Sequence, residues 1–148
     1  ATICQGGREG WLSQIYDLAH VEETYRGGIA AYKEAGIKDP RKEISIAEVH
    51  DCFSITELTI MEDLQFSPRG GVKDDIEAGT FNTDGGLKCF GHPIGATGLR
   101  MLYEVYKQLQ GKADKRQVKN PRLGLTHNQG GEPGAATVSV LIAGNELG

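Results

Sequence analysis

Short apolar segments, separated by glycine-rich stretches, organise this chain of 148 residues. Four of these segments have the β-branched composition, the alternation or the continuous apolar character of strands. They are Ala1–Gln5, Ile44–Val49, Leu123–Thr126 and Ala135–Ala143. The last, AATVSVLIA, is bounded by glycines and is typical of a buried strand, whereas the segment at Leu123 is expected to break into the loop HNQGGEPG.

Helical patterns occupy the chain between these strands. An Ala- and Glu-rich segment predicts a helix over Val21–Ala35, with Gly36 as its stop. Ser54 and Glu57 have the spacing of a capping box, which predicts a second helix that runs to about Leu64.

The clearest helical pattern covers Thr97–Leu109, where five apolar residues form one stripe: Leu99, Leu102, Tyr103, Tyr106 and Leu109. A short helix is also expected near Val72–Ala78. Strands alternate with helices, and no repeat or linker divides the chain. The pattern therefore predicts an α/β layer architecture for residues 1–148 as one domain.

Composition excludes several classes of protein. The formal net charge is −4, and the only basic stretch, GKADKRQVKNPR, is short. A nucleic-acid-binding protein would need a concentrated basic face, so no such partner is expected. No apolar run is long enough to span a membrane. The three cysteines, Cys4, Cys52 and Cys89, are not spaced as a disulfide framework, which indicates reduced thiols and a cytoplasmic location.

Ionisable residues recur where strands are expected to end. His50 and His127 each follow a predicted strand, and His92 lies in the turn GHPIGATG before the helix at Thr97. Ligands of α/β sheets bind at strand ends, because loops and helix N-termini meet there. Cys52 precedes the start of a helix by two residues, a position that favours a thiolate and makes it a candidate acid, base or nucleophile.

Other interpretations of these residues stay open. Each histidine or cysteine could be a hydrogen-bonded or buried structural residue, and Asp51 could orient a neighbour or cap a helix. The set His50, Cys52, Cys89 and His92 could bind zinc, although the His-x-Cys spacing is too close for a usual knuckle, so no metal is expected. The turn GHPIGATG lacks the Lys-Ser/Thr pair of a phosphate-binding loop.

Three motifs resemble one family. NTDGGLKCFGHPIGATGLRM, at residues 82–101, resembles the thiolase signature Asn-x-x-Gly-Gly followed by Gly-His-Pro-x-Gly-x-x-Gly. EVHDCFSITEL resembles the His-Asp-Cys-Phe motif of thiolases linked to sterol carrier protein, and HNQGGEPG resembles the His-Asn-x-Gly loop of that branch. The resemblance covers the C-terminal half of a thiolase. It implies a βαβαβαββ domain with a mixed five-stranded sheet, one half of an αβαβα arrangement.

The resemblance also implies residue roles in acyl transfer between CoA thioesters. His92 would donate to the thioester oxygen in an oxyanion hole. His50 occupies the position where common thiolases carry an Asn that holds a water in that hole. Cys52 would move the α-proton of the acetyl group, while Cys89 is expected to be structural.

Three further residues are assigned to substrate binding or the oxyanion holes by the same resemblance. They are Asn82, which opens the signature, His127, which replaces the cysteine of a Cys-x-Gly loop, and Gly130, whose amide would serve the acyl-enzyme. The nucleophilic cysteine belongs to the N-terminal half, and no stretch of this chain matches its surroundings.

The resemblance therefore implies a chain that is active only in an oligomer with an N-terminal half, with CoA as substrate and without a cofactor. Two alternatives keep the fold. One is a thiolase-like retro-aldolase subunit with a partner that has an OB fold and a zinc ribbon. The relatives that do this chemistry tend to lack the Gly-His-Pro histidine, which is present here as His92. The other is a non-catalytic scaffold subunit.

Overall fold

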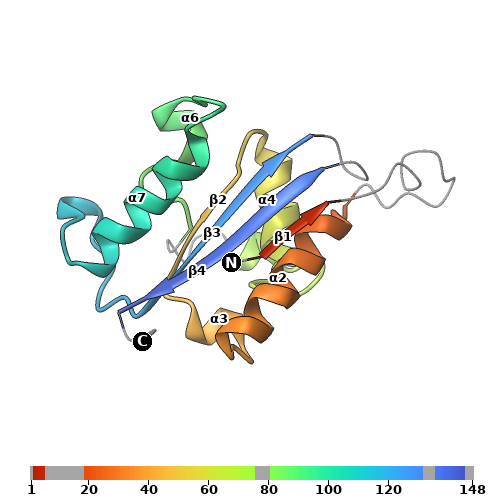
Figure 1. The fold of residues 1–148 in the computed structure, drawn as a ribbon, viewed down its shortest axis with the longest axis horizontal. Coiled ribbons are helices and arrows are strands. Elements are labelled where there is room, and N and C mark those ends of the chain that lie inside the picture. Colours follow the sequence, from red (N-terminus) through yellow and green to blue (C-terminus); the bar gives the residue numbers. More distant parts are fainter. Residues whose placement is uncertain (1, 6–18, 76–80, 132–135, 146–148) are drawn as a thin grey trace, which may run out of the picture.

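The computed structural model describes residues 2–5, 19–75, 81–131 and 136–145. Its described residues form a mixed four-stranded sheet in the order β1-β4-β3-β2 (Figure 1). The pair β2–β3 is parallel, and the pairs β3–β4 and β1–β4 are antiparallel. The strands are β1 (Thr2–Gln5), β2 (Ile46–Val49), β3 (Leu123–Gly130) and β4 (Thr137–Gly144).

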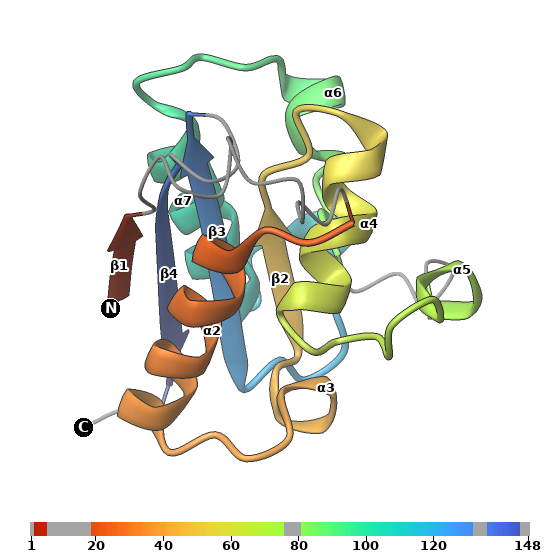
Figure 2. The same ribbon diagram turned by 90° about the vertical axis from the view of Figure 1, so that its right-hand side faces the viewer.

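Helices cover both faces of this sheet. Two lie on one face, α2 (Glu22–Ala35) and α4 (Ser54–Asp63), and α7 (Thr97–Leu109) lies on the other (Figures 1 and 2). The remaining elements are short: α3 (Pro40–Glu43), α5 (Val72–Asp75), α6 (Gly86–Phe90) and a 3₁₀ turn, η2 (Asp114–Arg116). The predicted α/β layer architecture is confirmed. In the described part of the chain, no helix is both long and apolar enough to cross a membrane.

The expected fifth strand is reduced to one bridge among the described residues. Phe81 pairs in parallel with Ala47 at the outer edge of β2. The next residue, Asn82, has a φ of 43° and turns the chain away from the sheet. The Asn82 side chain then accepts a hydrogen bond from the Val49 amide at 2.8 Å, so a side chain replaces the next step of the ladder.

The apolar core lies between the sheet and the pair α2 and α4. Val49, Leu125 and Val138 of the sheet share one buried core with Ile60 of α4 and with Leu64, the residue directly after that helix. Tyr32 of α2 donates its hydroxyl to the Leu64 carbonyl at 2.7 Å. Burying an aliphatic side chain of this size contributes about 1.5–3 kcal/mol, so this face supplies most of the hydrophobic stabilisation.

The boundaries of α2 and α7 agree with the sequence patterns, but the apolar stripe of α7 does not face the sheet. Leu99, Tyr103 and Tyr106 of the predicted stripe are 70%, 61% and 55% exposed. The face that packs on the sheet is formed instead by Thr97, Met101, Glu104, Val105 and Gln108. The strongest apolar stripe of α7 therefore points away from its own sheet.

Two local predictions also need correction. The capping box is wrong, because Ser54 is already helical and Glu57 accepts a hydrogen bond from Asn82 at 2.9 Å instead of closing the turn. The strand at Leu123 does not break at residue 127. It pairs with β4 as far as Gly130, since a long antiparallel hairpin continues the ladder.

Candidate functional site

His50 lies directly beyond the end of β2, as predicted. Parallel pairing of Val49 with His127 brings the next residues of each strand, His50 and Asn128, side by side. The two side chains are hydrogen-bonded, with His50 Nδ1 3.1 Å from Asn128 Oδ1. Burial lowers the pKa of His50, and the nearby His92 lowers it further, whereas the Asn128 contact acts in the opposite direction. The ring is therefore neutral at physiological pH.

His92 meets His50 at this end of the sheet. The chain reaches it through Gly91, whose φ of 82° and ψ of 172° are open only to glycine. The two imidazoles lie edge to face, with ring centroids 5.0 Å apart and an interplanar angle of 77°. His92 Nδ1 lies 2.8 Å from the hydroxyl of Thr97, the first residue of α7.

The two rings are held by contacts of opposite direction, because Asn128 Oδ1 can only accept from His50, whereas the Thr97 hydroxyl can donate to His92. Each uses Nδ1 for its contact, and neither Nε2 has a hydrogen-bond partner among the described residues. A Thr97 hydroxyl that donates to Nδ1 places the proton of a neutral His92 on Nε2. That N–H can then donate to a ligand oxygen, whereas His50 is nearly closed to solvent at 5% exposure.

Cys52 stands two residues beyond His50 and two before the first residue of α4. Its side chain is half-buried and free of any disulfide. Its Sγ lies 3.9 Å from Thr56 Oγ1, a long and weak contact. A thiol with so little local hydrogen bonding is available to react with a ligand.

His127 does not join this cluster. It is an interior residue of β3, not the strand-end residue that the sequence predicted, because the strand continues beyond it. Its ring is fully buried on the opposite face of the sheet, where Nε2 meets the Thr24 hydroxyl at 3.0 Å. Burial lowers the pKa of His127 to about 3, and His50 adds a smaller lowering, so the ring stays neutral.

The other two predicted residues lie outside the pair of imidazoles. Asn82 uses both ends of its amide within the fold, accepting from the Val49 amide and donating to Glu57. Gly130 ends β3 opposite Thr137 and is exposed. Among the described residues, no group of three or more His, Cys, Asp or Glu side chains could hold a metal ion. The zinc alternative, with His50, Cys52, Cys89 and His92 as ligands, is therefore not supported.

The sequence prediction missed the two residues that hold the imidazoles. Asn128 lies inside the quoted motif HNQGG, and Thr97 closes the motif GHPIGAT. Alternation along β3 could have found Asn128, because a buried residue at 127 and a site residue at 128 must point to opposite faces. The contact of Thr97 depends on the turn geometry and has no periodic signal.

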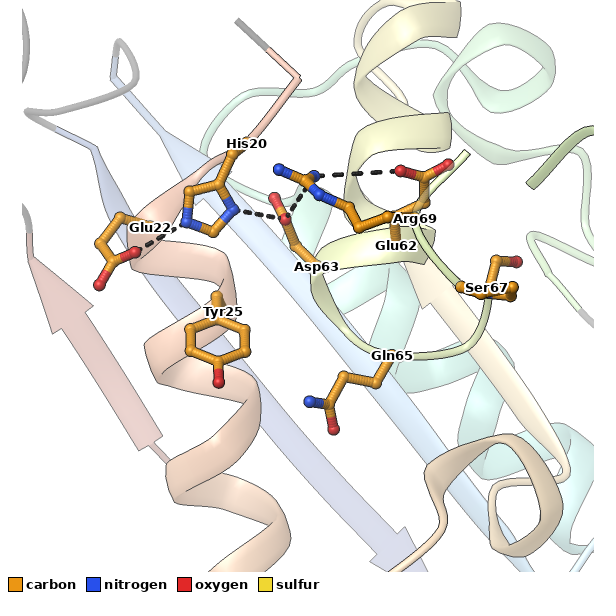
Figure 3. Close-up of a pocket in the computed structure, with 9 residues that line it drawn as sticks. His20, Glu22, Tyr25, Glu62, Asp63, Gln65, Ser67 and Arg69 are labelled. Carbon is orange, nitrogen blue, oxygen red and sulfur yellow. Dashed lines mark hydrogen bonds and ion pairs between the residues drawn. The ribbon is translucent and has the colours of Figure 1, made fainter. Parts of the chain in front are cut away.

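A separate pocket of about 550 Å³ lies at the start of α2 (Figure 3). There His20 bridges Asp63 and Glu22 at 2.7 Å each, and Asp63 also accepts from the Val21 amide at 2.7 Å. Arg69 reaches Asp63 from the other side at 3.4 Å. These contacts fasten the start of α2 to the end of α4.

Known proteins have sequences similar to most of this chain. An acetyl-CoA acetyltransferase of Methanothermobacter thermautotrophicus is 39% identical over 133 residues, which are 84% of this chain and 34% of that protein. Sterol carrier protein 2 of Gallus gallus is 38% identical over 128 residues, 81% of this chain and 23% of that protein. This chain thus spans about a third of the first relative's length and about a quarter of the second's.

The fold itself has a solved counterpart. The chain superposes on a protein described as Ltp2-ChsH2(DUF35) aldolase with a TM-score of 0.74 and 19% identity, over 99% of this chain and 39% of that one. The family described as thiolase C-terminal domain-like matches residues 5–143. Nearly the whole sequence is covered by that match, and so the chain belongs to the thiolase C-terminal domain-like family.

Proposed function

We propose that this chain supplies the acceptor side of a thiolase active site, which transfers acyl groups between CoA thioesters. One observation carries the proposal: two imidazoles from separate motifs meet with their centroids 5.0 Å apart, each held through Nδ1, next to the thiol-bearing turn of Cys52. Sequence similarity to an acetyl-CoA acetyltransferase supports the same chemistry.

In the synthetic direction the Cys52 thiolate takes the α-proton of acetyl-CoA. The resulting carbanion attacks the thioester carbonyl carbon of an acyl-enzyme, forming a C–C bond and releasing the nucleophilic cysteine of the N-terminal half as thiolate. His92 donates through Nε2 to the acetyl thioester oxygen, where negative charge develops. His50 borders the same oxyanion hole, and the Gly130 amide serves the acyl-enzyme oxygen.

Asn82 and His127 have indirect roles in this proposal. Asn82 joins the end of β2 to α4 and thereby orders the loop that leads to the signature glycines. His127 is buried on the far face of the sheet, where its contact with Thr24 joins β3 to α2, and the next residue of β3, Asn128, lies against His50.

The partner in this proposal is an N-terminal thiolase half, in the same polypeptide or a separate one. Its docking surface is the exposed apolar side of α7 with the adjoining turn. This surface, called the α7 outer face below, consists of Phe90, Ile94, Leu99, Tyr103 and Tyr106. Contiguous exposed apolar residues of this size mark interaction surfaces, and an obligate interface would bury more than about 2,000 Å².

The test is thiolysis of acetoacetyl-CoA by the assembled protein. His92→Asn and Cys52→Ser are each expected to lower kcat by about 10²–10⁴-fold, because each removes a group that acts in the transition state. Cys89→Ser, which changes an exposed thiol on α6, and His20→Asn, at the pocket of Figure 3, are the matched controls. Full activity in both test variants would leave the scaffold alternative as the better explanation.

A retro-aldolase is the second candidate, because the solved counterpart of the fold is described as an aldolase. In that case the partner would be a subunit with an OB fold and a zinc ribbon. Thiolysis consumes free CoA, whereas retro-aldol cleavage does not. Turnover of a 3-hydroxyacyl-CoA without free CoA would favour the aldolase, and CoA-dependent cleavage of acetoacetyl-CoA would favour the thiolase.

A further inference from the structure

Asp51 connects the two motifs that carry the imidazoles. It lies between His50 and Cys52, and it is only 3% exposed. Its carboxylate does not cap α4, the helix that follows it. Oδ1 accepts instead from the amide of Leu87 at 2.8 Å, in the first turn of α6.

Lys88 adds a second connection between the same two segments. Its Nζ donates to the main-chain carbonyl of Asp51 at 2.8 Å and lies 3.5 Å from the carboxylate. The turn after β2 is therefore held to α6 through both its side chain and its backbone. Hydrogen bonds to an ionised carboxylate are roughly twice as strong as neutral ones.

The Asp51 carboxylate also lies directly against the backbone of Gly86. A methyl group added to Gly86 would come within 2.4 Å of Oδ2 and 2.7 Å of Oδ1. Gly86 has a φ of 62°, which further disfavours any other residue. The close contact explains the second glycine of the Asp-Gly-Gly sequence, because no larger residue leaves room for the carboxylate.

Helix α6 leads straight to the second imidazole. Only Gly91 separates Phe90, its last residue, from His92. The contact of Asp51 with Gly86 and Leu87 thus fixes the start of the turn that carries His92, relative to the position of His50. His50 is the residue before Asp51, so the spacing of 5.0 Å between the rings depends on this junction, together with the contacts of His50 with Asn128 and of His92 with Thr97.

We propose that Asp51 is a positioning residue that sets the separation of His50 and His92 through its contact with Gly86 and Leu87. This inference rests on the proposed thiolase function for its kinetic consequence, but its geometric consequence is independent of any activity. Asp51 touches no substrate. It acts through the two imidazoles, whose placement decides how well an oxyanion is bound.

The first test compares Asp51→Ala with Asp51→Asn in the assembled protein. Asp51→Ala is expected to lower kcat for acetoacetyl-CoA thiolysis by about a hundred-fold and to change KM by less than about three-fold, because only the transition-state contact is lost. Asp51→Asn keeps an oxygen for the Leu87 amide and is expected to recover most of that loss. A fall in kcat without any recovery in Asp51→Asn contradicts the proposal.

The second test uses the close contact at Gly86. Gly86→Ala pushes the carboxylate away and is expected to lower kcat about as much as Asp51→Ala does. In the Asp51→Ala background the methyl group has room, so adding Gly86→Ala should cost less than a further three-fold. Gly111→Ala is the matched control, because Gly111 has a similar φ of 69° and no neighbour within 4 Å of an added methyl.

A crystal structure of the assembled Asp51→Ala protein supplies the readout that needs no activity. The His50–His92 centroid distance is expected to increase from 5.0 Å. An unchanged distance together with unchanged kcat overturns the proposal while the thiolase function stands. A wild-type protein without thiolase activity overturns the proposed function, and the distance in the variant then decides on Asp51 alone.

Discussion

The two faces of the sheet are packed in opposite ways. On the α2 and α4 face, apolar side chains such as Leu64 and Val138 are buried, as in an ordinary domain core. On the other face, α7 packs polar residues such as Glu104 and Gln108 toward the sheet, while Leu99 and Tyr103 point outward. A helix normally turns its apolar stripe to the core. In the proposed function, the N-terminal thiolase half would cover the α7 outer face.

The charged residues follow the same division. Under α7, Arg100 forms an ion pair with Asp84 and lies 3.9 Å from Glu48, whose side chain is fully buried in β2. Glu104 pairs with Arg116 at 2.9 Å. The α2 side also has charged contacts, of His20 with Glu22 and Asp63, but these lie at the start of α2, and the fully buried ring of His127 is neutral. Polar contacts accompany the buried Met101 and Val105 under α7, whereas the contact of the sheet with α2 and α4 is mostly apolar.

The largest expected effect concerns association through the α7 outer face. Tyr103→Glu is expected to weaken binding of a separately expressed N-terminal half by at least about a hundred-fold, because an unpaired carboxylate buried at an interface costs several kcal/mol. Affinity is measured by sedimentation of the mixed halves. Tyr25→Glu, on the outer side of α2, is the matched control, since Tyr25 is also a helical and exposed tyrosine.

The control variant should associate like the unsubstituted chain. Equal affinity of both variants would mean that the α7 outer face is not the docking surface. A loss in Tyr25→Glu alone would place the missing layer on the α2 side and reverse the comparison of the two faces.

The sequence predicted the elements better than their orientation. The helices at Glu22–Ala35 and Thr97–Leu109 agree with their patterns to within one residue, because periodicity and the stop at Gly36 are local signals. The pattern of α7 did not predict which of its sides is buried, because an amphipathic pattern identifies an apolar stripe but not what covers it. The true inner face is set by long-range contacts such as that of Arg100 with Asp84.

The site could be predicted only in part for the same reason. Motifs identified His50 and His92, and the structure brings them together. The residues that fix them, Asn128 and Thr97, act across strand register and turn geometry, which no local pattern encodes. His127 seemed to share the site because the sequence does not show where β3 ends.

The next effect concerns His127 on the α2 face. Its pKa of about 3 in the folded protein lies below the ordinary value of 6.5, so between these values only the unfolded chain holds the proton. Stability is therefore full above pH 6.5 and falls as the pH decreases, by about 1.4 kcal/mol per pH unit. From pH 6.5 to pH 5, urea denaturation should show wild type losing about 2 kcal/mol relative to His127→Gln.

His20 provides a control of opposite sign. Burial acts to lower its pKa, but hydrogen bonds to Glu22 and Asp63 outweigh burial and raise it. A raised pKa stabilises the fold at low pH, and this stabilisation is lost as the pH increases. The His20→Gln variant should therefore have a lower free energy of unfolding than wild type at pH 5, and this difference should shrink as the pH rises to 8. A His127→Gln curve parallel to that of wild type would contradict the assignment of a neutral buried ring.

The smallest effect concerns Glu48 under α7. Burial, followed by the charge of Asp84, raises its pKa from 4.5 to about 9, so between these values only the folded protein holds the proton. Stability then falls as the pH rises, and Glu48→Gln, which resembles the protonated form, should be the more stable protein at pH 8 by roughly 1 kcal/mol. Arg100 favours the ionised form and limits the gain. Glu104→Gln breaks the ion pair with Arg116 and should lower the stability of the protein at pH 8. Urea denaturation of both variants therefore distinguishes a carboxyl whose burial disfavours the ionised form from a carboxyl that is held in an ion pair. If Glu48→Gln also destabilised at pH 8, the polar contacts under α7 would include an ionised Glu48, and the two faces would differ in charge as well as in packing.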